Sequence, residues 1–134
     1  MTTKGDILVV DDDVDLSDSL RIILENHGYG VRTAASSRET LAALEATAPD
    51  VIILDIMMAT ESEGFDLADS IRKKPGLENL PIILLTSFLD KVREEGPDRF
   101  QQILGREWPA RWLFEKPVDT KRLLSKIEGI LGGK

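Results

Sequence analysis

Three short, uninterrupted runs of branched apolar residues limit most strongly what this chain can fold into. The runs are Ile7–Val10, Val51–Leu54 and Ile82–Leu85. A continuous apolar run of this length is typical of a strand that is buried on both faces, and such strands occur in parallel sheets covered by helices. None of the runs approaches the roughly 20 apolar residues that span a bilayer. The chain is therefore predicted to contain a parallel sheet and no membrane-inserted segment.

Helical periodicity appears between and after these runs. The expected helices carry inward apolar residues at Leu16, Leu20, Ile23 and Leu24, at Leu41 and Leu44, at Phe65, Leu67, Ala68 and Ile71, and at Leu123, Leu124, Ile127, Ile130 and Leu131. Two further strands are expected at Tyr29–Ala34 and Trp112–Phe114, and Phe88–Arg111 is expected to form one or two short helices with loops. This alternation predicts an α/β fold, a doubly wound parallel sheet with helices on both faces.

Individual residues indicate where the helices end. Gly28 is a C-terminal signal for the first helix, because many helices end at a glycine in the left-handed conformation. Ser36 and Glu39 have the spacing of a capping box, which opens the second helix, and that helix must end before Pro49. His27, the only histidine, is expected to be a helix-end residue rather than a metal ligand or a phosphorelay histidine.

Size and charge narrow the class of protein. A chain of 134 residues has the length of one domain, so a single domain over residues 1–134 without an output domain is expected. The absence of cysteine excludes disulfides and thiolate zinc sites, and the N-terminal residues lack an export signal, which makes the cytoplasm the expected location. The net charge of −7 argues against direct binding to nucleic acid, which depends on neutralising phosphates with Lys and Arg.

Polar side chains stand directly after the predicted strands. They are Asp11 and Asp12 after the first, Asp55 after the third, Thr86 after the fourth and Lys116 after the fifth. Ligands of such sheets bind at the carboxyl ends of the strands, so these five residues are expected to converge. Three carboxylates repel one another unless a cation intervenes, and Mg²⁺ prefers oxygen ligands while leaving room for a phosphate. Because a carboxylate can also accept a phosphoryl group, the pattern predicts magnesium-assisted phosphorylation of an aspartate.

The sequence resembles the receiver domains of two-component response regulators over essentially its whole length. Four segments carry the resemblance in the family's order, namely ILVVDDDVD, DVIILDIMM, PIILLTS and FEKPVD. The resemblance implies a flavodoxin-like, five-stranded sheet of order 2-1-3-4-5. It also implies a stand-alone, CheY-like receiver that takes a phosphoryl group from a sensor histidine kinase or a histidine phosphotransfer protein. Its output would be altered contacts with an unidentified downstream protein, and a homodimer is compatible with it.

The same resemblance implies a role for each residue of the site. Asp55 would be the phosphoacceptor, while Thr86 and Lys116 would hold the phosphoryl oxygens. The magnesium ligands would be Asp12 and Asp55 directly, Asp11 through water, and the backbone carbonyl of Met57. The protein would assist its own phosphorylation and dephosphorylation and would not be an enzyme with a separate substrate.

The chain departs from the family pattern near the site. Ala59 replaces the usual proline after the acceptor, and Leu113 occupies the position at which receivers commonly carry a switch aromatic. The segment between Thr86 and Lys116 is longer than usual. Met57 and Phe88 occupy the two positions that tune loss of the phosphoryl group. Neither side chain can orient a water by hydrogen bonding and both can shield an acyl phosphate, so a long-lived phosphorylated state is expected.

Two other functions remain open at this point. In a haloacid-dehalogenase-like phosphohydrolase, Asp11 and Asp13 would be the nucleophile and the acid, but no acidic pair follows Lys116 and Asp55 would have no role. A pseudo-receiver that acts only as a binding module would fit the altered segments, but the intact acidic trio of Asp11, Asp12 and Asp55 and the presence of Lys116 argue against it. A calcium loop is excluded, because its sixth and twelfth positions would be Leu16 and Ile22 rather than glycine and glutamate.

Overall fold

The computed structural model describes residues 4–55, 63–86, 112–115 and 118–132. The strands are β1 (Asp6–Val10), β2 (Gly30–Ala34), β3 (Val51–Asp55), β4 (Ile82–Thr86) and β5 (Trp112–Glu115). The helices are α1 (Val14–Asn26), α2 (Ser37–Ala46), α3 (Glu63–Arg72) and α6 (Thr120–Gly132). The segment 88–111, for which one or two short helices are predicted, lies outside the described residues.

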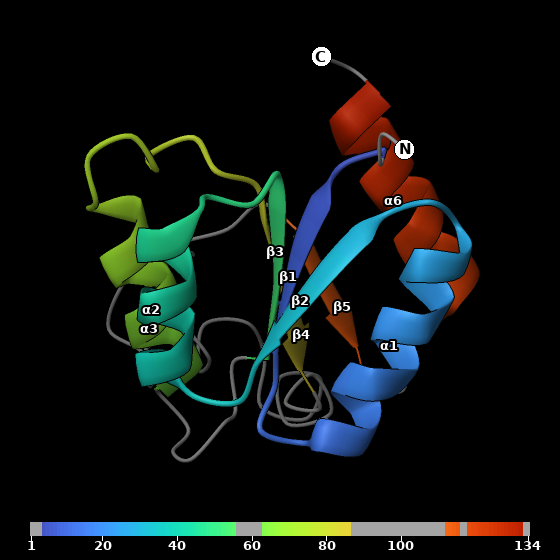
Figure 1. Ribbon diagram of the computed structural model, residues 1–134, viewed down its shortest axis with the longest axis horizontal. Helices are drawn as coiled ribbons and strands as arrows, with labels where there is room; N and C mark the ends of the chain where they lie inside the picture. The colour runs from blue at the N-terminus through green and yellow to red at the C-terminus, as the bar shows by residue number, and fades with distance from the viewer. Residues whose placement is uncertain (1–3, 56–62, 87–111, 116–117, 133–134) are drawn as a thin grey trace, which may run out of the picture.

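The strands form one parallel sheet between two layers of helices. Their order is β2-β1-β3-β4-β5, and every neighbouring pair is parallel. Helices α2 and α3 cover one face, and α1 and α6 cover the other (Figure 1). The prediction of a doubly wound α/β sheet with helices on both faces is therefore confirmed. All strands point the same way, so their carboxyl ends share the edge at which α1 begins (Figure 1).

Alternate residues of each central strand enter different halves of the core. On the α2 and α3 side, Leu8, Ile52 and Leu84 belong to one buried cluster. On the α1 and α6 side, Ile53 and Ile83 belong to the other. The apolar residues of β1, β3 and β4 are fully buried, which explains why these strands are uninterrupted in hydrophobicity rather than alternating.

The turn from α1 to β2 shows how a glycine ends the first helix. Gly28 has φ +93, the left-handed region, and His27 is the helix cap, with its Nδ1 at 2.8 Å from the carbonyl oxygen of Ile23. The helix-end interpretation of His27 is confirmed. Tyr29 was predicted as the first residue of the strand, which is wrong by one position. Its N–H donates back to the carbonyl of Leu24 at 3.2 Å, so Tyr29 still closes the helix and β2 starts at Gly30.

The capping box before α2 is also present. Ser36 is the N-cap, and its Oγ accepts from the N–H of Glu39 at 3.1 Å. The Glu39 carboxylate accepts from the N–H of Ala35 at 3.4 Å, one residue earlier than in the ideal box. The helix ends at Ala46, before Pro49 as predicted. Arg32 of β2 then donates to the carbonyl oxygens of Ala43 and Thr47, which fixes the end of α2 against the sheet.

Tyr29 provides a test of the packing between the start of the sheet and α6. Burial, and then the negative charge of Glu128, raise the pKa of Tyr29 above its usual value of 10.0. The fold therefore favours the neutral phenol, and stability present below pH 10.0 should be lost as the pH rises through the raised pKa. Tyr29 is the only tyrosine, so its phenolate absorbance reports one group. We expect a titration midpoint above 10.0 in the folded protein and a smaller alkaline loss of stability in Tyr29→Phe; a midpoint at or below 10.0 would contradict this.

The first and last described residues pack together at the amino edge of the sheet. A Cβ added to Gly5 would lie 2.7 Å from Cδ1 of Leu131, so a larger residue there would require the Leu131 side chain of α6 to shift. Lys4 bonds through its N–H to the carbonyl of Gly28, and its ammonium lies 5.7 Å from the centroid of the Tyr29 ring. Within the described part of the chain, no helix is long and apolar enough to cross a membrane.

Candidate site at the carboxyl ends of the strands

Three carboxylates meet at the carboxyl ends of β1 and β3. Asp11 and Asp12 follow β1, and Asp55 is the last residue of β3. One carboxylate oxygen from each lies within 4.8 Å of the other two. Asp11 is 1% exposed and Asp55 is 3% exposed, whereas Asp12 is exposed to solvent. The predicted convergence of these three residues is what the structure shows.

Backbone groups hold Asp11 in place. Its N–H donates to the carbonyl of Ala34 at the end of β2, at 3.0 Å. Its side chain accepts from the N–H of Asp13 at 2.9 Å, which draws the start of α1 toward the site. Asp13 itself is the N-cap of α1 and accepts from the N–H of Leu16 at 3.2 Å. Asp11 and Asp13 therefore differ in role: Asp11 belongs to the acidic trio, whereas Asp13 caps the helix.

Ser17 is a buried neighbour of the site that the sequence analysis missed. It is 3% exposed, and its Oγ donates to the carbonyl oxygen of Asp11 at 3.4 Å. Ser17 lies on the buried face of α1 with Leu20 and Leu24, where an apolar residue is the usual choice. The signal that could have found it is a small hydroxyl residue on the inward face of the helix that follows the acidic pair.

The remaining predicted site residues are placed only in part. Thr86 ends β4, and its Cα pairs with that of Glu115 on β5, directly before the position of Lys116. This register brings the ends of β4 and β5 to the same edge as Asp55, whose Cα pairs with that of Leu85. Lys116 and Met57 lie outside the described residues, as does the hydroxyl of Thr86.

The arrangement fits a small, hard cation. Two oxygens on opposite sides of a magnesium ion are about 4.2 Å apart, since each Mg–O bond is about 2.1 Å. The 4.8 Å limit on the three carboxylate oxygens is close to that span, so one ion could be held directly by some and through water by others. Buried carboxylates that share a site repel one another, and a divalent cation removes that repulsion. The donors that the described residues provide are carboxylate oxygens, which suit Mg²⁺ better than a thiophilic metal.

The acidic trio predicts that Mg²⁺ stabilises the fold. A ligand that binds only the folded chain adds about 1.4 kcal/mol of stability at ten times its Kd, which raises Tm by several degrees in a domain of this size. We expect this shift in the wild-type protein and a much smaller one in Asp55→Asn, measured by thermal unfolding monitored by circular dichroism. The control is Asp15→Asn, in the first turn of α1 and outside the trio, which should keep the full shift. Equal shifts in all three proteins would place the ion elsewhere.

The fold and the acidic trio together define a class, and comparison with known families agrees with them. A family model described as the response regulator receiver domain matches residues 7–128. The chain belongs to this family. The receiver interpretation of the sequence is confirmed, and it displaces the phosphohydrolase alternative.

The curated relatives include regulators and a small protein of similar length. An uncharacterized 14.6 kDa protein encoded in the sodA1 3′ region of Leptolyngbya boryana is 43% identical, with 92% of this chain and 87% of that protein covered. The CpxR homolog of Haemophilus influenzae, a transcriptional regulatory protein, is 34% identical over 93% of this chain and 49% of its own length. The DNA-binding response regulator MtrA of Mycobacterium tuberculosis is 30% identical over 97% of this chain and 52% of its own length. The chain thus spans about half the length of these two regulators.

Solved structures show the same architecture. The chemotaxis response regulator CheY4 of Vibrio cholerae is 29% identical, with a TM-score of 0.76 over 96% of this chain and 99% of that one. The signal receiver domain of a signal transduction histidine kinase from Syntrophus aciditrophicus is 31% identical, with a TM-score of 0.79 over 96% of this chain and 91% of that one. The flavodoxin-like fold expected for a receiver is therefore the fold of this chain.

Proposed function

We propose that the chain is a phosphoacceptor receiver in which Asp55 takes a phosphoryl group in a magnesium-dependent reaction. The convergence of Asp11, Asp12 and Asp55 at one sheet edge is the observation that carries the proposal. A carboxylate oxygen of Asp55 attacks the phosphorus of the donor. The bond from phosphorus to the donor's leaving atom breaks, and the product is an acyl phosphate on Asp55. The released donor group takes up a proton as its own pKa requires.

Each neighbouring residue has a defined part in this proposal. Mg²⁺ supplies positive charge that offsets the carboxylates and the phosphoryl oxygens. Asp12 and Asp55 would ligate it directly, with Asp11 acting through water and the Met57 carbonyl completing the set. Thr86 and Lys116 would hold phosphoryl oxygens, in line with the place of β4 beside β3 and of β5 beside β4. The same residues would assist hydrolysis of the acyl phosphate, so the protein acts on itself.

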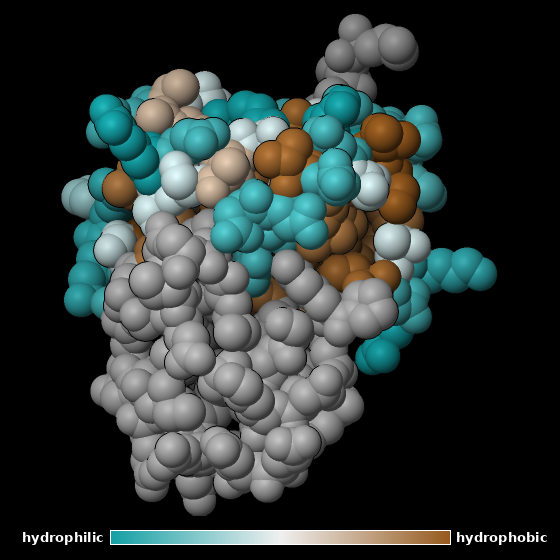
Figure 2. Space-filling model, turned by 90° about the horizontal axis from the view of Figure 1, so that it is seen from below, coloured by the Kyte–Doolittle hydropathy of each residue, from teal (hydrophilic) through white to brown (hydrophobic). Residues whose placement is uncertain are grey.

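We propose that the phosphodonor is a sensor histidine kinase or a histidine phosphotransfer protein that docks on α1. Val14 and Ile22 on this helix are 58% and 52% exposed, high values for aliphatic side chains. A groove beside α1 is lined by Leu16, Leu20, Ile23 and Val118, among others. Seen from below, brown apolar atoms gather on the side of α1 and α6 (Figure 2). Such a surface beside Asp12 and Asp13 would let a partner helix present its phosphorylated histidine to Asp55.

The chain would act as a single receiver unit in the cytoplasm, without direct contact to nucleic acid or membrane. Its output would be a change in affinity for a downstream protein or for a second copy of itself. The pseudo-receiver alternative predicts the same fold and the same partner surfaces, but no covalent change at Asp55.

The deciding experiment is the intact mass of the purified protein after incubation with acetyl phosphate, with Mg²⁺ or with EDTA. We expect a single phosphoryl adduct that requires Mg²⁺. The adduct forms without any partner protein, so the result does not depend on knowing the kinase. No adduct under either condition would overturn the proposal in favour of the pseudo-receiver.

Once formed, the phosphorylated state is expected to persist. Met57 and Phe88, both outside the described residues, provide no hydrogen-bonding group to orient a water, and each can cover the acyl phosphate. Replacing Met57 with Asn, which can hydrogen-bond a water, should speed loss of the adduct by roughly tenfold. This is less than the roughly 10²–10⁴-fold of a positioned general acid or base, because an amide orients the water without taking its proton. The decay of the adduct after removal of acetyl phosphate measures this. An equal or slower decay in Met57→Asn would show that shielding does not set the lifetime.

A further inference from the structure

A groove on the β5 side of α6 gathers positive charge in a chain whose net charge is −7. Its volume is about 850 Å³, within the range of small-molecule sites. The described residues that line it are Phe114, Lys121, Arg122, Ser125, Lys126, Gly129 and Ile130. The groove is separate from the acidic trio, which lies at the carboxyl ends of β1 and β3 and has the opposite charge.

Arg122 and Lys126 are neighbouring cations on α6 for which the described residues provide no counter-ion. They stand four residues apart on α6, which places their Cβ atoms about 5–6 Å apart on one face of the helix. Like charges at this spacing destabilise a helix. Neither is in an ion pair with any acidic residue in the described part of the chain. The acidic residue within α6, Glu128, instead acts on Tyr29, and Asp119 before the helix accepts from the N–H groups of Lys121 and Arg122. An anion in the groove would relieve this repulsion.

Gly129 leaves the floor of the groove open. It lies inside α6, where glycine lowers helix stability relative to alanine. A Cβ added at Gly129 would have no atom within 4 Å, so no packing inside the described chain requires a glycine. Gly5 is the contrasting case, since an added Cβ there would collide with Leu131. Open space over a helical glycine allows a ligand from outside to approach the backbone closely.

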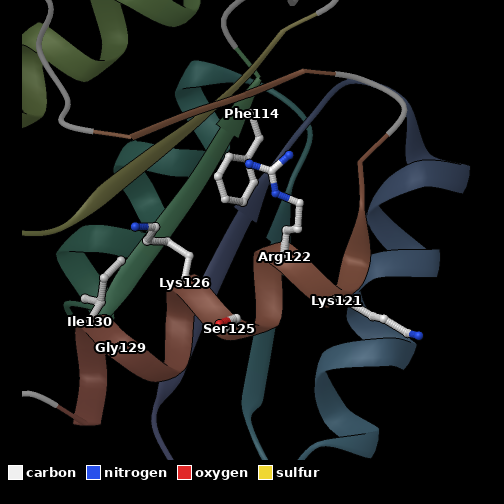
Figure 3. Close-up of a pocket in the computed structure, with 7 residues that line it drawn as sticks. All are labelled: Phe114, Lys121, Arg122, Ser125, Lys126, Gly129 and Ile130. Atoms are coloured by element: carbon white, nitrogen blue, oxygen red, sulfur yellow. The ribbon is translucent and has the colours of Figure 1, made fainter.

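The side chains above Gly129 offer both charge and an aromatic face. In Figure 3, Arg122 extends from α6 toward the ring of Phe114 on β5, and Lys126 rises from the same helix face. Lys121 extends the other way, toward α1 (Figure 3). Phe114 is only partly buried and packs at the border of the core cluster formed with α6. The groove thus offers two cations and the Ser125 hydroxyl beside an accessible aromatic ring.

We propose that this groove binds a nucleotide, with its phosphates between Arg122 and Lys126 and its base against Phe114. Arg and Lys are the side chains suited to phosphate oxygens, through paired hydrogen bonds and through a point charge respectively. Planar bases stack on aromatic side chains irrespective of their identity. An acidic protein segment could pair its carboxylates with the two cations, but its acidic side chains have no planar ring to stack on Phe114. A nucleotide would contact both the cations and the aromatic ring, so it fits the lining better.

The test is titration of the ¹⁵N-labelled protein with ADP in EDTA, followed by amide chemical shifts. Working without Mg²⁺ and repeating the titration in Asp55→Asn separates this groove from the acidic trio. We expect saturable shifts at Gly129 and its helical neighbours, with a Kd on the order of 1 mM or tighter. Inorganic pyrophosphate should shift the same amides but bind at least about fivefold more weakly, because it lacks a base to stack.

Matched variants assign the contacts. Lys126→Gln should weaken ADP binding about tenfold, as expected for loss of a charge-assisted hydrogen bond. Lys73→Gln removes the same charge from an exposed side chain beyond α3, outside the groove, and should change the Kd less than about twofold. Gly129→Ala should raise Tm and yet weaken the binding of ADP. A misfolded variant would not show a raised Tm. The proposal is overturned if ADP gives no saturable shift, if pyrophosphate binds as tightly as ADP, or if hexaglutamate shifts these amides while ADP does not.

Discussion

Asp55→Asn should abolish the phosphoryl adduct formed with acetyl phosphate and Mg²⁺. Asparagine has nearly the same shape as aspartate but no anionic oxygen to attack phosphorus, so the adduct should fall by more than about a hundredfold, as for other removed nucleophiles. The fold should survive. Asp55 lies within 4.8 Å of two other carboxylates, and neutralising it removes a repulsion. In EDTA we therefore expect Asp55→Asn to unfold at an equal or higher temperature than the wild type.

Asp13→Asn is the matched control for that experiment. Asp13 belongs to the same acidic stretch but is the N-cap of α1, a position that asparagine fills about as well. The variant removes one negative charge close to the site and should keep the adduct. If Asp55→Asn still forms the adduct and Asp13→Asn does not, the nucleophile lies in the stretch after β1 and the proposed role of Asp55 is wrong. Intact mass and peptide mapping of both variants give the answer.

Ile53→Ala should be among the most damaging single substitutions in the central strands. Ile53 is fully buried on β3 and pairs with Val9 on one side and Ile83 on the other. Truncating a buried isoleucine to alanine costs about 2–5 kcal/mol, and a domain of this kind has roughly 5–15 kcal/mol in total. We therefore expect a large drop in the urea concentration at the midpoint of unfolding. Tryptophan fluorescence measures this transition.

Ile22→Ala makes the same chemical change on the surface. Ile22 is 52% exposed on α1, so its truncation should alter the free energy of unfolding by about 0.5 kcal/mol or less. Alanine also favours the helix more than isoleucine does. Comparable losses in the two variants would mean that α1 is docked against something in solution, or that the β3 core repacks around the cavity.

The hydrophobic pattern was sufficient to predict the sheet and its helical layers. The runs in β1, β3 and β4 are buried on both faces, so each residue of the strand had to be apolar and the pattern is unambiguous. The end of α1 was less well predicted. Gly28 was correctly identified as the helix end, but the bond from Tyr29 back to Leu24 depends on the geometry of that turn and has no signature in hydrophobicity.

The sequence predicts the positions of some site residues but not of others. Asp11, Asp12 and Asp55 follow strands, and a parallel sheet brings strand ends together, so their proximity follows from topology alone. Ser17 was missed because its role depends on which face of α1 turns inward. The groove on α6 was missed for a related reason. In the sequence, Arg122 and Lys126 have the pattern of an ordinary solvated helix surface. The position of Phe114 and the open space at Gly129, which only the structure shows, distinguish the groove from such a surface.

The packing of Gly5 against Leu131 determines how this protein can be attached to other objects. It places the first and last described residues side by side at the amino edge of the sheet, while the carboxylates lie at the opposite edge (Figure 1). A surface tether or a fluorescent label attached next to Gly5 or Leu131 would therefore stand away from the start of α1 and from Asp55. Immobilised in this orientation, the receiver would present its reactive edge to the solution, and a phosphodonor could reach it unhindered.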